Sequence, residues 1–144
     1  MIAVDTNLLV YSVRENVPEH RRARDVIASL AAGSEDWAIP WPCVHEFLGV
    51  VTNPRLFHTP MPMELAVAAV DGWRGADNIV FLGEIEGYWA VLVTFLEEGR
   101  TRGAQVHDAR IAALCRSHGV RELWTADRDF SRFPSLRCRN PLRD

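Results

Sequence analysis

Lysine is absent from this sequence, because all 16 basic residues are arginines. The absence excludes two classes of protein that, like this chain, begin with a strand ending in an aspartate. Phosphatases of the haloacid dehalogenase type need a lysine, and they also need a second aspartate where this chain has Asn7. Receiver-like signalling domains need a lysine as well. The aspartate at position 5 therefore requires a different chemical explanation.

Cysteine is also scarce. Cys43, Cys115 and Cys138 are widely spaced and odd in number, so the sequence offers neither a disulfide framework nor the CxxC pairs of a zinc site. We expect them to be small core residues. The five histidines form no HxxxH motif and no pair with cysteine at zinc spacing, which argues against a histidine-based metal site.

Long hydrophobic runs are missing too. The apolar stretches are far shorter than the roughly 20 residues of a membrane span. Asp5 and Asn7 interrupt the N-terminus where a signal peptide would need an apolar region. We therefore expect a cytoplasmic protein without a membrane association. The formal net charge of −3 does not by itself indicate binding to nucleic acid.

The hydrophobic content is nevertheless high enough for one core, at 48% of 144 residues. We expect a single domain over residues 1–144, because no repeat or linker interrupts the chain. Runs typical of strands alternate with helical spacing. Strands are expected at residues 1–4, 37–40, 78–82, 122–125 and 136–139, and helices at 8–13, 18–32, from 42 through 51, 64–73, 88–96 and 107–118. The alternation predicts a three-layer α/β/α fold with a mainly parallel central sheet.

Several acidic residues occupy comparable places in this arrangement. Asp5 ends the first strand, and Asp127 and Asp129 follow the strand at 122–125. Asp108 stands in the first turn of a helix, and Glu46 falls opposite the buried stripe of another helix. In a parallel sheet, the ends of strands and the starts of helices share one edge, so these acids can converge in one cleft.

Each acid also has a simpler explanation. Asp5 can cap the following helix, Asp108 can complement a helix dipole, Asp127 can stabilise a turn, and Glu46 can be an ordinary surface residue. Several carboxylates in one cleft, however, cannot all stay ionised without a cation. A hard divalent metal with oxygen ligands resolves the repulsion, and such a site suits the hydrolysis of a phosphodiester bond.

Four local motifs together resemble the signature of PIN-domain ribonucleases. They are Ile2–Asn7, Glu46 near the start of a helix, His107–Ala112 and Leu123–Phe130. The order of the motifs and the aspartate close to the N-terminus are similar to the VapC-type toxins of bacterial toxin–antitoxin pairs. The motifs cover about a fifth of the chain, and the last two are the more specific ones.

The resemblance implies a PIN-like fold and a Mg²⁺-dependent endoribonuclease, with Mn²⁺ as the alternative ion. It implies Asp5, Glu46, Asp108 and Asp127 as the catalytic acids, with Asp5 and Asp108 as direct metal ligands. Thr6, Asn7 and Thr125 would surround them, and Asp129 would be a helper or a ligand of a second metal. The resemblance further implies a homodimer and inhibition by a small antitoxin protein.

Basic residues should surround an acidic cleft that binds RNA, because the acids repel the phosphates of the substrate. The candidates for RNA binding are Arg55, Arg100, Arg102, Arg110 and Arg128. Arg110 and Arg128 can equally well pair with neighbouring acids. The alternative to an enzyme is a PIN-like module that binds RNA or a protein without catalysis, and the sequence does not name the RNA.

Overall fold

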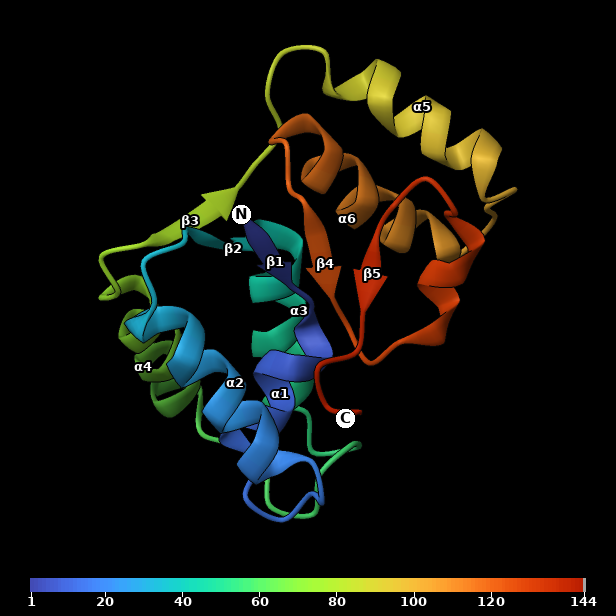
Figure 1. Ribbon diagram of the computed structural model, residues 1–144. Helices are drawn as coiled ribbons and strands as arrows, with labels where there is room; N and C mark the ends of the chain where they lie inside the picture. Colours follow the sequence, from blue (N-terminus) through green and yellow to red (C-terminus); the bar gives the residue numbers. More distant parts are fainter. Residues whose placement is uncertain (144) are drawn as a thin grey trace.

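The first strand of the chain forms the middle of a five-stranded parallel sheet, as the computed structural model shows for residues 1–143 (Figure 1). Residue 144, the last of the expected domain, lies outside the described residues. The strands follow the order β3-β2-β1-β4-β5, and every neighbouring pair is parallel. Their bounds are β1 Ile2–Val4, β2 Trp37–Pro40, β3 Ile79–Leu82, β4 Glu122–Trp124 and β5 Cys138–Arg139.

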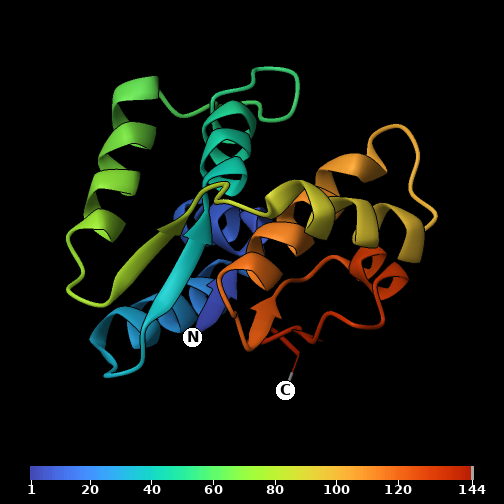
Figure 2. The same ribbon diagram turned by 90° about the horizontal axis from the view of Figure 1, so that it is seen from above.

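Six α-helices flank this sheet within residues 1–143, and they confirm the predicted α/β/α fold (Figures 1 and 2). Helix α5 packs against α6, and α1 packs against α2. A short 3₁₀ helix, Arg128–Arg132, follows β4. The helix bounds are α1 Thr6–Val13, α2 His20–Ala32, α3 Trp41–Val51, α4 Met63–Arg74, α5 Tyr88–Glu98 and α6 Gln105–Ser117.

Most of the predicted elements lie within one or two residues of the observed ones. The first helix begins at Thr6 rather than at residue 8, because Asp5 caps it: the Asp5 Oδ1 accepts a hydrogen bond from the Thr6 backbone N–H at 2.8 Å. Cys43 and Cys115 are buried, as expected. The expectation was wrong for Cys138, which is exposed because β5 is a short edge strand of two residues.

The core explains why β1 is central. All three β1 residues are buried, and the neighbouring strand β2 is buried along its whole length. Strands covered on both faces are expected to be apolar throughout, as Ile2, Ala3 and Val4 are. The Asp5 backbone N–H donates to the Trp124 carbonyl at 3.0 Å. The residues that follow β1 and β4 therefore lie next to each other at the carboxyl edge of the sheet.

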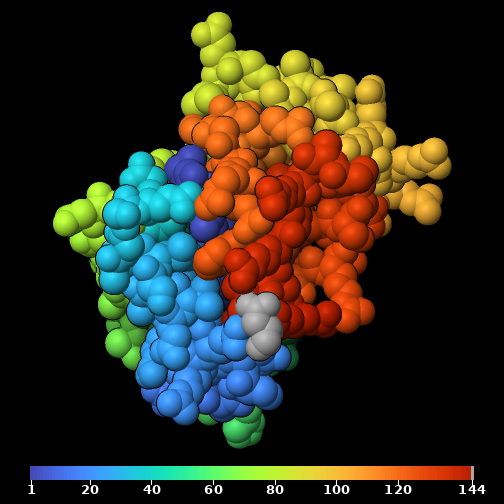
Figure 3. All heavy atoms as spheres, viewed as in Figure 1, coloured from blue at the N-terminus to red at the C-terminus, as the bar shows by residue number. Residues whose placement is uncertain are grey.

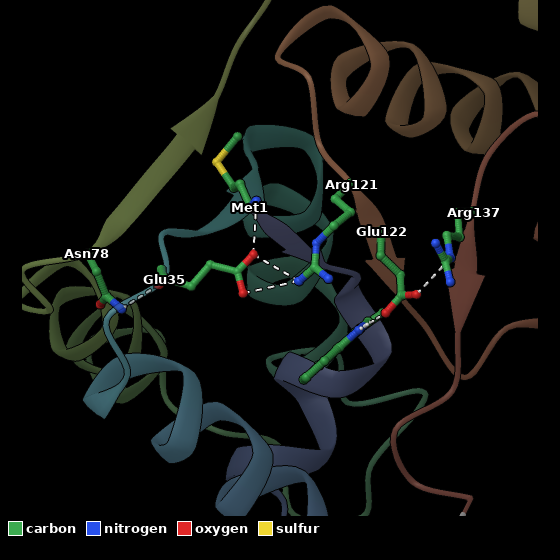
Figure 4. A network of polar contacts seen from close by, with 7 residues as sticks. Met1, Glu35, Asn78, Arg121, Glu122 and Arg137 are labelled. Atoms are coloured by element: carbon green, nitrogen blue, oxygen red, sulfur yellow. Dashed lines mark hydrogen bonds and ion pairs between the residues drawn. The ribbon is translucent and has the colours of Figure 1, made fainter.

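Polar contacts tie the opposite, amino edge of the sheet together (Figure 4). Glu35, which precedes β2, binds the Met1 amino group at 3.1 Å and the Arg121 guanidinium at 2.9 Å. Its backbone carbonyl accepts a hydrogen bond from Asn78 Nδ2 at 2.9 Å. Glu122 in turn pairs with Arg137 at 3.3 Å, next to β5. Each of these residues stands at the start of a strand or just before it. Their contacts therefore hold the amino edge of the sheet together.

The C-terminal segment returns to the N-terminal half of the chain. Arg22 on α2 donates a hydrogen bond from its Nε to the Pro141 carbonyl at 3.0 Å. Figure 3 shows the surface of α2, in light blue, meeting the red surface of this segment. In the part of the chain that the structure describes, no helix is both long enough and apolar enough to cross a bilayer.

Candidate active site

The carboxyl edge of the sheet carries the acids that the sequence singled out. Asp5 follows β1, Asp127 follows β4, Asp108 lies in the first turn of α6, and Glu46 lies on α3. All four line one cavity of about 380 Å³, together with Thr6 and other residues of α1. Because the four acids come from four separate elements, only the folded chain brings them together.

Asp5 is the most tightly held of these acids. Its side chain is buried, with 4% exposed, and both carboxylate oxygens accept hydrogen bonds. Oδ2 accepts from Thr125 Oγ1 at 2.7 Å and from Asn7 Nδ2 at 3.3 Å, while Oδ1 accepts from the Thr6 backbone N–H at 2.8 Å. The Cys43 thiol adds a longer contact of 3.6 Å to Oδ1. The carboxylate is therefore fixed in orientation before any ligand arrives.

Burial nevertheless raises the pKa of Asp5 from its ordinary value of 3.8 to about 6. The hydrogen bonds from Thr125 and Thr6 oppose the rise, and the negative charge of Glu46 adds to it. Removing a carboxylate from water disfavours its charged form more than these hydrogen bonds stabilise it. A positive charge in the cavity would therefore stabilise the ionised form of Asp5 and lower its pKa again.

The side chains expected around Asp5 join the ends of β1 and β4. Besides donating to Asp5, Thr125 Oγ1 accepts from the Asp127 backbone N–H at 2.9 Å. The Asn7 side chain contacts Thr125 Oγ1 at 3.4 Å, and its Oδ1 accepts from the Ala126 backbone N–H at 3.1 Å. These bonds hold the start of α1 against the turn after β4, and they place Asp127 beside Asp5.

A second group of acids lies beside Asp5. One carboxylate oxygen from each of Asp108, Asp127 and Asp129 lies within 4.8 Å of the other two. Partial burial, followed by the charges of Asp127, Asp5 and Asp129, raises the pKa of Asp108 to about 6. Asp127 Oδ1 also accepts from the Asp129 backbone N–H at 2.8 Å, which shapes the turn. Asp129 is exposed, whereas Asp108 and Asp127 are half-buried.

Glu46 differs from the other acids that line the cavity because it is exposed. The helical spacing of α3 turns Val44, Phe47 and Val51 into the core and leaves Glu46 on the opposite face. Its Oε2 accepts a hydrogen bond from the Thr6 hydroxyl at 3.3 Å. Glu46 is thus the acid of this cavity that solvent, or a substrate, reaches most easily.

The donors of this site suit a hard divalent cation. The clustered side chains offer carboxylate oxygens, which Mg²⁺ and Mn²⁺ prefer over nitrogen or sulfur ligands. Burial, with a smaller contribution from neighbouring negative charges, raises the pKa of both Asp5 and Asp108, and a bound cation would oppose both effects. The residues present therefore fit a metal ion, although the side chains alone do not select one ion over another.

The predicted RNA-binding arginines fall into two groups. Arg110 forms an ion pair with Glu84 at 3.2 Å, which agrees with the simpler of its two explanations. Arg55, Arg100, Arg102 and Arg128 have exposed side chains. Sequence reasoning missed Arg132, whose charge lowers the pKa of Asp108. Arg132 lies three residues after Asp129, and this short separation could have indicated that it lies near the acids.

Sequence reasoning also missed the apolar lining of the cavity. Tyr11 and Phe57 both line it, beside the acids. Tyr11 lies four residues after Asn7 on α1, so the helical period alone placed it on the same face. Phe57 belongs to the loop between α3 and α4, and nothing in its local sequence indicated that the loop turns toward the acids.

A larger cavity of about 640 Å³ lies between α2 and the β4–β5 side of the sheet, on the face that Figure 3 shows. Its carboxylates belong to Asp25 and Glu35. Glu35 is already neutralised by the Met1 amino group and Arg121, and Asp25 is exposed on α2. This cavity therefore lacks the acidic cluster that distinguishes the smaller one.

Comparison with known proteins identifies the family. The sequence profile of the PIN domain matches residues 2–136. The chain is 32% identical to Ribonuclease VapC48 of Mycobacterium tuberculosis over 138 residues, which are 96% of this chain and 95% of that protein. It is 34% identical to VapC ribonuclease Mb2897 of Mycobacterium bovis over 142 residues, which are 99% of this chain and 96% of that protein. The chain belongs to the VapC family of PIN-domain ribonucleases.

Solved structures of VapC proteins share its fold. The crystal structure of Mycobacterium tuberculosis VapC20, described as a toxin that cleaves the sarcin–ricin loop, matches with a TM-score of 0.67 and 19% identity. The match covers 91% of this chain and 93% of that one. A toxin–antitoxin complex from Klebsiella pneumoniae matches with a TM-score of 0.62 and 20% identity, over 98% of both chains. These likenesses confirm the predicted VapC-type fold.

Proposed function

We propose that the protein is a Mg²⁺-dependent endoribonuclease and the toxin of a VapBC-type toxin–antitoxin pair. The observation that carries the proposal is the convergence of Asp5, Glu46, Asp108 and Asp127 on one cavity. Surface acids kept for solubility would not be gathered at the buried end of the central strand. The VapC relatives are named as ribonucleases, and this supports hydrolysis of RNA as the reaction.

Each acid has a role that its surroundings support. Asp5 and Asp108 are the direct metal ligands, because burial raises the pKa of both and a cation reverses that effect. Asp127 would hold the ion through a water molecule, and Asp129 would support Asp127 or hold a second ion. Glu46 is exposed and held by the Thr6 hydroxyl, so it is placed to orient the attacking water and to accept its proton. The metal, when bound, lowers the pKa of that water and neutralises charge on the phosphate.

Exposed arginines favour RNA as the substrate. Arg55, Arg100, Arg102 and Arg128 are exposed and hold the phosphates on either side of the cleaved bond. Arg110 contributes less, since Glu84 already neutralises it. A folded RNA with a single-stranded loop is the substrate class, because the acidic cavity admits a narrow segment of chain rather than a duplex.

The proposal also includes partners. An antitoxin covers the cavity and inhibits the enzyme, and two copies of the chain form a homodimer in the cytoplasm. The toxin–antitoxin complex among the structural neighbours supports a protein partner. Exposed apolar side chains such as Trp89, with 70% exposed, and Ile85, with 46% exposed, leave surface for both contacts.

Mapping of RNA ends tests the proposal. The wild-type protein is induced briefly in cells and new 5′ ends are sequenced, and the mapped RNA is then cut in vitro with Mg²⁺, Mn²⁺ or EDTA. We expect Asp5→Asn and Asp108→Asn to slow cleavage by roughly 10²–10³-fold, the scale for a group that stabilises charge in the transition state. Asp25→Asn changes an exposed carboxylate on α2 and should leave the rate unchanged.

The same experiment distinguishes the non-catalytic alternative. A module that only binds would retain RNA in the presence of Mg²⁺ without producing new ends, and the two substitutions would leave that binding intact. Cleavage that is equally fast in wild type, Asp5→Asn and Asp108→Asn would reject the assignment of the metal ligands while leaving the protein a nuclease.

A further inference from the structure

The candidate active-site cavity has two chemically different halves. One half consists of the acids and their hydrogen-bonding neighbours. The other half is apolar or aromatic, although it belongs to the same cavity, and it is formed by Val10, Tyr11, Val50, Leu56, Phe57 and Ile111. Metal coordination and phosphodiester hydrolysis account for the acidic residues of the cavity. They do not account for its apolar residues.

Helices α1 and α3 set the distance between the two halves. Tyr11 lies four residues beyond Asn7, and Val50 lies four residues beyond Glu46, so each lies about 6 Å further along its helix. That offset is similar to the reach from a phosphate to the base of the same nucleotide. A nucleotide with its phosphate at the acids would therefore place its base against the apolar half.

The loop after α3 places two apolar side chains, Leu56 and Phe57, in the apolar half of the cavity. Asn53 organises it: its Oδ1 accepts from the Arg55 backbone N–H at 2.9 Å. The Asn53 carbonyl accepts from the backbone N–H groups of Leu56 at 3.1 Å and Phe57 at 3.2 Å. Leu56 is thereby kept 59% exposed even though it lines the cavity. Arg55 precedes it and adds a positive charge suited to a phosphate.

Phe57 is held in place in the apolar half by a buried arginine, and Tyr11 lines the same cavity. The Arg14 guanidinium lies 4.1 Å from the centre of the Phe57 ring, and Arg14 is itself buried, with 8% exposed. Partial burial, followed by the charges of Glu19 and Asp127, raises the pKa of Tyr11. Its phenol therefore stays protonated at neutral pH, and it can donate a hydrogen bond to a base.

We infer that Tyr11, Val50, Leu56 and Phe57 form a subsite for one unpaired nucleobase next to the cleaved phosphate. The inference rests on the proposed function and specifies which part of the RNA the cavity takes. Acids and apolar groups one helical turn apart match the spacing of the phosphate and the base within one nucleotide, which favours a nucleotide as the occupant. Because a base in a duplex is stacked and paired, the subsite restricts cleavage to single-stranded positions.

Binding of mononucleotides tests the subsite without requiring a known RNA. The protein is titrated, in the presence of Mg²⁺, with AMP, GMP, CMP, UMP and ribose 5-phosphate, and Kd values are measured by NMR. We expect at least one nucleotide to bind roughly 5- to 150-fold more tightly than ribose 5-phosphate, the range for stacking of one base on an aromatic side chain. Leu56→Ala and Phe57→Leu should remove most of that difference.

Leu65→Ala is the matched control, because Leu65 is similarly exposed but lies on α4, and it should retain the full difference. Equal affinity for the four nucleotides and ribose 5-phosphate would overturn the inference and leave the apolar half to a protein segment. The inference also fails if Leu65→Ala weakens nucleotide binding as much as Leu56→Ala does. Since the titration measures binding and not cleavage, loss of the subsite and loss of the nuclease are observed separately.

Discussion

Replacing Asp5 by asparagine should stabilise the metal-free protein at neutral pH, even though we propose Asp5 as a metal ligand. The folded state raises the pKa of Asp5 from 3.8 to about 6, chiefly by burial. One pKa unit corresponds to about 1.4 kcal/mol. The ionised carboxylate therefore destabilises the folded, metal-free protein by about 3 kcal/mol once the pH exceeds 6.

Asparagine recovers only part of this free energy. Its amide nitrogen would meet the Thr125 hydroxyl, which now donates to Asp5 Oδ2 at 2.7 Å, and losing that bond costs about 1 kcal/mol. We expect Asp5→Asn to be more stable than wild type by about 1–2 kcal/mol at pH 7.5. Neutralising a functional acid often has this effect, because the site trades stability for activity.

The difference in stability between Asp5→Asn and wild type should depend on pH. The folded-state pKa of Asp5 is the higher one, so the folded protein binds the proton more tightly between pH 4 and 6. Wild type therefore loses stability as the pH rises through this window, whereas Asp5→Asn lacks the titration. The advantage of the variant should be absent near pH 4 and complete above pH 6.

Urea unfolding in EDTA, followed by tryptophan fluorescence from pH 4 to 7.5, measures this difference. Asp25→Asn is the control, since it removes an exposed carboxylate. Mg²⁺ at about 100 times its Kd should add about 2.7 kcal/mol to wild type and less to Asp5→Asn. The reasoning is refuted if Asp5→Asn is less stable than wild type at pH 7.5, or if the difference is the same at every pH.

Three further outcomes are expected. Cleavage should increase as the pH rises through about 6, because Asp5 and Asp108 must lose protons to bind metal; a rate that stays flat from pH 5 to 7.5 contradicts this. Thr125→Val should slow cleavage about 10- to 100-fold, and Thr125→Ser should restore it, since the hydroxyl orients Asp5. Gly99→Ala should lower the free energy of unfolding by about 1–3 kcal/mol, because a Cβ there would overlap the Phe133 ring, and an unchanged urea midpoint would disprove it.

The architecture was largely predictable from the sequence because its signals are local. Buried strands such as Ile2–Val4 are continuous apolar runs, and the helices carry apolar residues at helical spacing. The acids were predictable as a set for a related reason. In a parallel sheet, residues that follow strands or open helices meet at one edge, and Asp5, Asp108 and Asp127 all take such positions.

The rest depends on contacts between distant segments. The pairing of Arg110 with Glu84 and the packing of Arg14 on Phe57 join elements whose sequences give no sign of each other. The three prolines at residues 53–62 are typical of a loop, but the path of this loop over the cavity is set by hydrogen bonds to the Asn53 backbone carbonyl. Turn geometry of this kind is not determined by composition.

The pairing of β1 with β4 also determines when, during synthesis of the chain, the acidic cavity can form. Asp5 is synthesised about 120 positions before Thr125 and Asp127. At about 5–20 residues per second, that interval is on the order of 6–25 s. Until it ends, the growing chain has the central strand but not the neighbour that completes the acidic cavity. An incomplete copy released from the ribosome before β4 would therefore lack the acidic cavity.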